Sequence, residues 1–241
     1  MASADRGWHR WAKPSGHTQL DVVEWPQHSV VLVLDLASGA HMVNDFWRFF
    51  DDIAAPQLAH RAATMQATFE YLDKLTDPLV IIETGSVRLA DNWAGDGQST
   101  ILFDRYATIR PGCQVYTVDN SVVSSQECSK LVSNRVQVYC EDSVVCLHRL
   151  ARQTWPEGTS FLFYLDSFDV DFNNPYPSAA HHLKEMVAIS PLLRNDSLVV
   201  VDDSPAQPRG KGFLIAEYAQ AVGAKTLFHA YQLGLTGFIA R

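Results

Sequence analysis

The sequence predicts an α/β protein built on a doubly wound, mostly parallel sheet, and three observations support this prediction. Short apolar segments alternate with helical patterns at the spacing of strand–helix–strand units. The last two strands have no helix between them, which predicts an antiparallel hairpin at one edge. The first central strand is an unbroken apolar run, the kind expected of a buried parallel strand. The expected strands are Leu79–Ile82, Val115–Val118, Val136–Cys140, Phe161–Leu165 and Ser197–Val201, followed by Lys225–Tyr231 and Thr236–Ala240.

Composition and charge limit the classes of function. The chain has 241 residues, of which 47% are apolar and 19% charged, as in an ordinary soluble globular protein. A net charge of −8 argues against a general nucleic-acid or anionic-membrane binder, because either needs a basic face. The sequence contains neither a membrane-span pattern nor a secretory signal pattern, so we expect a cytoplasmic protein. Its four cysteines lack zinc-ligand spacing and are expected to be free thiols.

Residues 1–75 precede the first central strand and are expected to form an arm followed by a helical cap. Val30–Leu36 is apolar enough for a strand. Asn44 is a candidate N-cap for a first helix, and a second helical pattern runs from about Pro56 to Leu75. These helices could form a substrate lid, a contact in a homo-oligomer or a cover over one face of the sheet. Residues 76–241 are expected to form the main domain.

The first central strand, Leu79–Ile82, is an unbroken apolar run, which is typical of a buried parallel strand. Gly85 and two further glycines follow it before a helical pattern begins near Thr100. A strand, a glycine-rich loop and a helix in this order bring backbone amides to a ligand. The spacing is not that of the dinucleotide motif. Glu83 at the strand end instead suggests a nucleoside with a cationic or amino-acid tail.

Helical patterns also fill the later intervals between strands. One follows the third strand and ends near Gln153, and two more are expected at Ala179–Leu193 and Lys211–Val222. Asp171–Ser178 is predicted to be a loop by its asparagine and proline turn chemistry. This loop would lie at the mouth of the sheet, where it could contact a substrate or serve only as surface.

The acids at the strand ends are the strongest functional signal. In an open parallel sheet, ligands bind outside the carboxyl ends of the strands. One acid at a strand end can be a helix N-cap, but five in register crowd like charge at one edge. Such crowding costs stability unless cations or hydrogen-bond donors share the site, so we predict a functional edge. The acids are Glu83, Asp119, Glu141–Asp142, Asp166 and Asp202–Asp203.

Position along the edge separates the roles of these acids. Asp119, beside the glycine loop, is placed to accept both hydroxyls of a ribose. Asp142 and Ser143 lie where an adenine ring would follow, and Glu83, deep at the loop, suits an ammonium group. Three carboxylates without a nearby lysine or arginine would form an oxygen cage for Mg²⁺. These three are Asp166, Asp202 and Asp203.

Together these segments resemble the class I S-adenosylmethionine-dependent methyltransferases. The likeness is strongest to the metal-dependent O-methyltransferases, and within them to the macrocin O-methyltransferase (TylF-like) sugar methyltransferases, with catechol O-methyltransferase more distant. It covers roughly residues 79–241 and implies a seven-stranded Rossmann-like sheet. The matching segments are Glu83–Gly85, Gly95–Ser99, Val118–Asp119, Glu141–Ser143, Tyr164–Asp169 and Val201–Ser204.

The resemblance assigns ligand contacts residue by residue. It implies that three residues of the glycine loop hold the methionine part of S-adenosylmethionine, namely Glu83, Gly85 and Ser99. It implies that Asp119 binds the ribose and that Asp142 and Ser143 bind the adenine. It also implies that the three aspartates of the predicted oxygen cage, Asp166, Asp202 and Asp203, bind Mg²⁺.

The sequence departs from the family at two places. The general base of the family stands three residues after the first metal aspartate as a histidine or lysine, and here that position is Asp169. A carboxylate there can still accept a proton, especially if it is buried beside other acids. His181 or His182 on the following helix is the alternative, although packing or capping is the more ordinary role for either one. The second departure is the insertion Val87–Ala94, which could cover the cofactor or reach the acceptor.

The resemblance implies Mg²⁺-dependent transfer of a methyl group to a hydroxyl of a sugar or saccharide-containing acceptor with neighbouring hydroxyls. Three alternatives stay open at this point. One is a methyltransferase of a catechol-like phenolic natural product, and another is a metal-dependent hydrolase or hydroxylase on the same fold. The third is a nucleotide-binding domain without catalysis. No nucleic-acid or membrane partner is expected.

Overall fold

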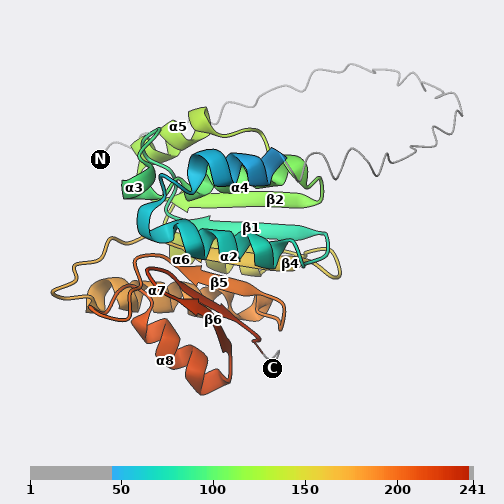
Figure 1. Ribbon diagram of the computed structural model, residues 1–241. Coiled ribbons are helices and arrows are strands. Elements are labelled where there is room, and N and C mark those ends of the chain that lie inside the picture. The colour runs from blue at the N-terminus through green and yellow to red at the C-terminus, as the bar shows by residue number, and fades with distance from the viewer. Residues whose placement is uncertain (1–44, 239–241) are drawn as a thin grey trace, which may run out of the picture. The chain divides into compact units, whose positions relative to one another are not determined.

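The computed structural model describes residues 45–238, which all belong to one unit of the chain (Figure 1). The strand predicted at Val30–Leu36 and the N-cap predicted at Asn44 lie outside this range. Within residues 45–238, no helix is both long and apolar enough to cross a membrane.

Seven strands form a single mixed sheet in the order β3-β2-β1-β4-β5-β7-β6. β1 to β5 are parallel, and β7 runs antiparallel to both β5 and β6. This confirms the predicted fold, a seven-stranded, mostly parallel, Rossmann-like sheet with an antiparallel C-terminal hairpin. The strands are β1 (Leu79–Thr84), β2 (Cys113–Asp119), β3 (Val136–Cys140), β4 (Ser160–Leu165), β5 (Leu198–Val201), β6 (Lys225–His229) and β7 (Leu233–Thr236).

The register of the parallel strands brings their carboxyl ends to one level. Thr84 of β1 pairs with Val118 of β2 and with Leu165 of β4, and Leu165 in turn pairs with Val201 of β5. The acids that follow Val118, Leu165 and Val201 therefore begin at the same edge of the sheet as the end of β1. This edge carries the candidate site.

Helices cover both faces of the sheet, as a doubly wound fold requires (Figure 1). Successive residues of β1 divide between two hydrophobic clusters: Leu79 and Ile81 pack on one face, and Val80 and Ile82 on the other. The first face is covered by α2 and α4, and the second by α6, α7 and α8. The helices are α2 (Ala62–Leu72), α3 (Trp93–Asp96), α4 (Ser99–Ile109), α5 (Val122–Leu131), α6 (Ser143–Ala151), α7 (Tyr176–Ile189) and α8 (Phe213–Val222).

The segment before β1 is helical and packs into the first of these clusters. A short π-helix, η1 (Phe50–Ala54), and a 3₁₀ turn, η2 (Ala59–Arg61), lead into α2. The ring centroids of Phe46 and Phe69 lie 4.7 Å apart, in the same hydrophobic cluster as Leu79 and Ile81 of β1. These helices thus cover one face of the sheet, and η2 brings Arg61 to its carboxyl edge. The domain boundary near residue 75 stays a prediction.

The C-terminal hairpin differs in detail from the prediction. Leu233–Leu235, which lies between the two strands expected here, belongs to β7, and that strand ends at Thr236. A Cβ at Gly234 would lie 2.5 Å from the ring of Phe228, so the glycine makes room for the aromatic side chain of β6. Gly237 then turns the chain with a φ of +72°. Gly234 interrupts the apolar pattern of β7, so the pattern did not predict a strand at this position.

Candidate functional site

A cavity of about 360 Å³ lies at the carboxyl edge of the sheet. Its wall combines η2 with the loops after β1, β2, β4 and β5, which are far apart in the sequence. Residues predicted for cofactor, metal and base all contribute to it. Those among the lining residues are Gly85, Ser99, Asp119, Asp166, Asp169 and Asp203.

Gly85 is the point where three strand ends meet. Its backbone N–H donates to the carbonyl of Val118 at 2.8 Å, which ties the loop after β1 to β2. Its φ is +83°, and an added Cβ would lie 2.4 Å from the backbone oxygen of Asp166 after β4. Only glycine satisfies both conditions, because the conformation is strained for L side chains and the space is filled. The predicted glycine loop is therefore built for close backbone approach.

Asp119 lines both this cavity and a neighbouring one of about 40 Å³, which are called the larger and the smaller cavity below. Its Oδ1 accepts the N–H of Ser121 at 2.8 Å, which fixes the carboxylate. Its Oδ2 is held only by long contacts of 3.4 Å from the amide and hydroxyl of Ser86. One oxygen is thus anchored and the other remains available to a ligand.

The predicted adenine residues line the smaller cavity. Asp142 is the N-cap of α6, with Oδ1 accepting the N–H of Val145 at 3.0 Å. The hydroxyl of Ser143 lies 3.0 Å from Nε2 of His181. The capping role that acids at strand ends commonly have is therefore real for Asp142, and it orients the side chain at the cavity wall.

Glu83 lies beneath the glycine loop and is not among the residues that line either cavity. Its carboxylate is fully buried and accepts hydrogen bonds from hydroxyl groups of α4 and β2. Oε1 accepts from Ser99 at 2.5 Å, and Oε2 accepts from Thr100 and Thr117 at 2.7 Å each. The predicted contact with the methionine part is corrected accordingly, since both oxygens are engaged in holding the loop and the start of α4.

The buried state of Glu83 predicts a pH dependence of stability. Burial raises the pKa of Glu83 from 4.5 to about 7, although the hydrogen bonds from Ser99, Thr100 and Thr117 oppose the shift. A raised pKa means that the folded state holds the proton more tightly, so this stabilisation is complete below pH 4.5 and is lost as the pH rises to 7. We expect the free energy of unfolding to fall by up to about 3 kcal/mol across this window.

The measurement is urea unfolding between pH 4.5 and 7.5, compared with Glu83→Gln, which lacks this titration. The readout is the slope of the free energy of unfolding against pH, compared between the wild type and the variant. The contributions of other titrating groups cancel in this difference. Parallel slopes for the two proteins would show that Glu83 does not titrate in this window.

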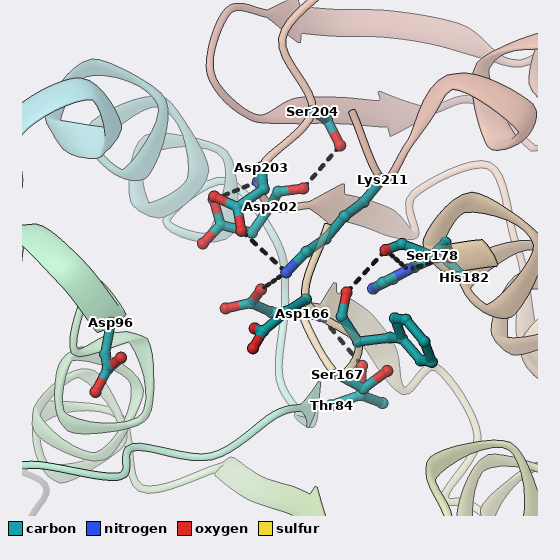
Figure 2. A network of polar contacts seen from close by, with 12 residues as sticks. Thr84, Asp96, Asp166, Ser167, Ser178, His182, Asp202, Asp203, Ser204 and Lys211 are labelled. Carbon is teal, nitrogen blue, oxygen red and sulfur yellow. Dashed lines mark hydrogen bonds and ion pairs between the residues drawn. The ribbon is translucent and has the colours of Figure 1, made fainter. Parts of the chain in front are cut away.

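The three predicted metal ligands are already paired with basic side chains, as Figure 2 shows for Lys211. Nζ of Lys211 contacts Oδ1 of Asp166 and lies 3.0 Å from Oδ2 of Asp203. Nε of Arg61 lies 2.7 Å from Oδ2 of Asp202, and Nη2 lies 3.0 Å from Oδ1 of Asp203. The expectation that no lysine or arginine lies near these carboxylates is wrong.

Asp202 is also saturated by neutral donors. Its side chain is fully buried, and Oδ1 accepts the N–H of Asp203 at 2.8 Å and the amide of Gln232 at 3.2 Å. The hydroxyl of Tyr164 reaches Oδ2 at 3.1 Å. Together with Arg61, these donors leave Asp202 no free oxygen for a metal.

The residues therefore do not fit Mg²⁺ in this arrangement. A magnesium site needs open carboxylate oxygens, and these oxygens face fixed cations instead. Among residues 45–238, no group of three or more His, Cys, Asp and Glu side chains is arranged to hold a metal ion. Burial lowers the pKa of Lys211, but the nearby Asp166 and Asp203 carboxylates outweigh it and raise that pKa above its usual value. The ammonium thus stays charged at neutral pH.

The three candidate bases occupy different environments. Asp169 lines the larger cavity, but its side chain is 84% exposed and lies 3.8 Å from Nη1 of Arg88, so it is not buried beside other acids. His181 lines the smaller cavity. His182 is fully buried on α7 and lines neither cavity, with Nδ1 2.8 Å from the carbonyl of Ser178 (Figure 2). Burial lowers the pKa of His182 to about 4, as expected for a neutral core histidine.

The insertion Val87–Ala94 folds back over the glycine loop. The backbone N–H of Val87 donates to the hydroxyl of Thr100 at 2.9 Å, and the amide of Gln98 donates to the carbonyl of Leu89 at 2.7 Å. Arg88 lines the larger cavity and pairs with Asp96 at 2.8 Å. The insertion thus contributes one cationic side chain to the wall, which the sequence pattern did not single out.

A third cavity, of about 570 Å³ and thus wider than the other two, has Tyr231 in its wall near the paired carboxylates and is lined largely by rings and apolar groups. Tyr231 belongs to its wall, and the guanidinium of Arg61 lies 4.9 Å from the centroid of that ring. Phe172 and His60 also line it, and the rings of His60 and Tyr231 are 5.5 Å apart. This volume is in the range of small-molecule sites.

A comparison with known proteins finds similarity in the course of the backbone only. No family model and no curated protein matches the sequence. Human methyltransferase-like protein 13 in complex with SAH is 14% identical with a TM-score of 0.44, covering 73% of this chain and 81% of that one. The O-methyltransferase NovP is 11% identical with a TM-score of 0.46, covering 73% and 77%. The sugar N-methyltransferase KedS8 from Streptoalloteichus is 11% identical with a TM-score of 0.38, covering 80% and 62%. These values assign neither a family nor an activity to the chain.

Proposed function

We propose that this protein is an S-adenosylmethionine-dependent methyltransferase that acts on a small molecule. The observation that carries the proposal is the position of Asp119 in the wall of two neighbouring recesses at the carboxyl edge of the sheet. One recess is bounded by the glycine loop, and the other by Asp142 and Ser143. A carboxylate in this place suits the two hydroxyls of a ribose, with a base on one side and a tail on the other.

The residues of the two recesses fit the nucleoside part by part. The available Oδ2 of Asp119 would accept ribose hydroxyls, and Asp142 and Ser143 would contact the adenine. Gly85 lines the larger cavity, and its close packing against the loop after β4 fixes the backbone that would face the methionine part. Arg88 offers a partner for its carboxylate. When bound, S-adenosylmethionine supplies a methyl group on a sulfonium, which is a strong electrophile, so the protein must chiefly position the acceptor and take its proton.

The acceptor would meet the cavity wall formed by Asp166 and Asp203, whose oxygens accept hydrogen bonds from hydroxyl groups. Three carboxylates against two basic side chains leave one negative charge near the expected sulfonium. Of the predicted bases, Asp169 is the one in this cavity, and we assign it the acceptor proton. A sugar hydroxyl is the acceptor that the sequence resemblance favours. A metal-dependent hydrolase is disfavoured, because fixed cations hold the aspartates it would use.

A phenolic acceptor is the second candidate, and the ring-lined cavity next to Arg61 favours it. Phe172 and Tyr231 offer faces on which a planar ring can stack. Methyl transfer from labelled S-adenosylmethionine to sugars and to catechols, tested side by side, distinguishes the two. We expect Tyr231→Ala to reduce transfer to a phenol more than transfer to a sugar.

The proposal predicts that Asp119→Asn weakens S-adenosylhomocysteine binding by at least about tenfold, because a charge-assisted hydrogen bond is lost. Calorimetric titration measures this directly. Asp77→Asn is the matched control, since Asp77 is an acid that pairs with Arg110 and lines neither cavity. Equal affinity in both variants and the wild type would contradict the proposed ribose contact, and no binding to the wild type would contradict the function.

A further inference from the structure

We infer that Lys211 and Arg61 are built-in cations that take the place of a divalent ion, so that the aspartate cluster works without metal. The aspartate cluster means Asp166, Asp202 and Asp203. The inference deepens the proposed function and rests on it for the meaning of the cluster in methyl transfer. Its physical content, the exclusion of divalent ions, is measurable whether or not the protein transfers methyl groups.

The backbone around Lys211 is shaped to deliver this side chain to the cluster. The N–H of Lys211 donates to the carbonyl of Asp203 at 2.9 Å, and the N–H of Gly212 donates to the hydroxyl of Ser204 at 2.8 Å. A Cβ at Gly210 would lie 2.0 Å from the carbonyl oxygen of Asp203, so only glycine fits there. The sequence Gly-Lys-Gly thus docks closely against the turn after β5.

The turn itself is in an unusual conformation. Asp203 has a φ of +41°, which residues with a Cβ rarely adopt. Strain of this kind persists where the surroundings fix it, and here the bonds from Lys211 and Gly212 do so. The turn and the Gly-Lys-Gly segment therefore form one unit, and this unit fixes the position of the Lys211 ammonium.

The ammonium of Lys211 lies between two strand ends, where a shared ion would lie. It bridges Asp166 after β4 and Asp203 after β5, and its side chain is fully buried (Figure 2). A divalent ion held by the same two carboxylates would have to displace the ammonium. The ammonium would then be buried without a partner, and burial makes an unpaired charge costly.

Arg61 occupies the other side of the cluster. Its Nε lies within 3.0 Å of both oxygens of Asp202, and its Nη2 reaches Asp203. The side chain of Arg61 is only 7% exposed, so this pairing is fixed by the fold. Arg61 comes from η2, before the part of the chain that resembles metal-dependent enzymes, and no motif in that part announces it.

The arrangement has a consequence for the acceptor. Lys211 lines neither the larger nor the smaller cavity, whereas Asp166 and Asp203 line the larger one. Lys211 is therefore a positioning residue that holds two carboxylates toward the acceptor. Carboxylates bind any hydroxyl or amine that donates a hydrogen bond, whereas a metal favours two chelating oxygens. An acceptor with a single donor group is sufficient at this site.

The experiment measures Mn²⁺ binding to the full chain by electron paramagnetic resonance, in which free and bound ions differ. Wild type and the control Lys130→Met should not bind at this cluster, since Lys130 is an exposed lysine paired with Glu127. Lys211→Met should bind Mn²⁺ at this cluster at least about tenfold more tightly than the wild type, because it frees one oxygen of Asp166 and one of Asp203. Arg61 still pairs with the other oxygen of Asp203. Lys211→Arg restores a cation and should return to the behaviour of the wild type.

Two results would overturn the inference. One is stoichiometric Mn²⁺ binding by the wild type that is lost in Asp203→Asn. The other is a Lys211→Met protein that neither binds Mn²⁺ nor gains melting temperature from it. Should that variant fold poorly, stabilisation by added Mn²⁺ is the readout, and its absence counts against the inference. S-adenosylhomocysteine binding to the wild type is measured in parallel, so failure of the proposed function is seen separately.

Discussion

Replacing Arg61 by alanine is expected to reduce the free energy of unfolding by about 3 kcal/mol, because it removes the cationic partner of a buried carboxylate. Asp202 has no exposed side-chain surface, and Arg61 contacts both of its oxygens. The neutral donors Tyr164 and Gln232 remain, but they do not offset a full charge. Urea unfolding at neutral pH measures the loss.

Arg88→Ala is the matched control for this prediction. Arg88 also lines the larger cavity and pairs with an acid, Asp96, but its side chain is 52% exposed. Exposed ion pairs contribute about 1 kcal/mol or less, so we expect little loss of stability. Arg61→Met combined with Asp202→Asn removes both charges and should recover part of the loss. Equal effects of Arg61→Ala and Arg88→Ala would contradict the account of a buried, paired cluster.

Gly85→Ala is expected to destabilise the protein by about 3 kcal/mol or more and to abolish S-adenosylhomocysteine binding, through overpacking and backbone strain together. The added methyl group would lie 2.4 Å from the backbone oxygen of Asp166 and 3.3 Å from Cα of Ser167. Because these are backbone atoms after β4, the loop of Asp166 has to move. That loop forms part of the wall of both recesses.

Gly158→Ala separates strain from crowding. Gly158 has a φ of +77°, close to the +83° of Gly85, but nothing lies within 4 Å of an added Cβ. We expect a loss of about 1 kcal/mol from the conformation alone, with ligand binding intact. Thermal melts and calorimetric titration of the two variants measure both quantities. Binding that survives in Gly85→Ala would place the ligand away from this loop.

The fold could be predicted from the sequence because the spacing of apolar residues follows which positions of each strand and helix are buried. β3 begins and ends where the pattern predicts, and β4 and β5 differ from the prediction by one residue at their starts. The error at β7 has a local cause, since Gly234 makes room for the ring of Phe228 and so breaks the apolar pattern. Helix ends depend on such side-chain details, which is why α8 begins at Phe213 instead of Lys211.

The candidate site was predictable at its acids but not at its cations. Strand ends are adjacent in space by the rules of parallel sheets, so a pattern of acids at strand ends locates the edge. Arg61 lies 141 residues from Asp202 in the sequence, and no spacing rule connects them. Lys211 did have a local signal, because two flanking glycines mark close backbone packing, but its direction depends on the turn at Asp203.

Glu83 shows the same limit in another form. Its position at the end of β1 indicated a ligand contact, and the hydroxyls that occupy it come from α4 and β2. Serine and threonine side chains carry no charge pattern that would reveal such a network in the sequence. An acid at the carboxyl edge of a sheet can therefore hold the binding loop in place by hydrogen bonds without contacting the ligand.

The most direct test is a crystal structure of the protein grown with S-adenosylhomocysteine and Mg²⁺ together. We predict that the ribose lies on Asp119, the adenine beside Ser143 and the amino-acid tail along Gly85, with the Lys211 ammonium still between Asp166 and Asp203. A nucleoside bound elsewhere would contradict the proposed cofactor site. An ion between those two carboxylates, with Lys211 displaced, would contradict the built-in cations.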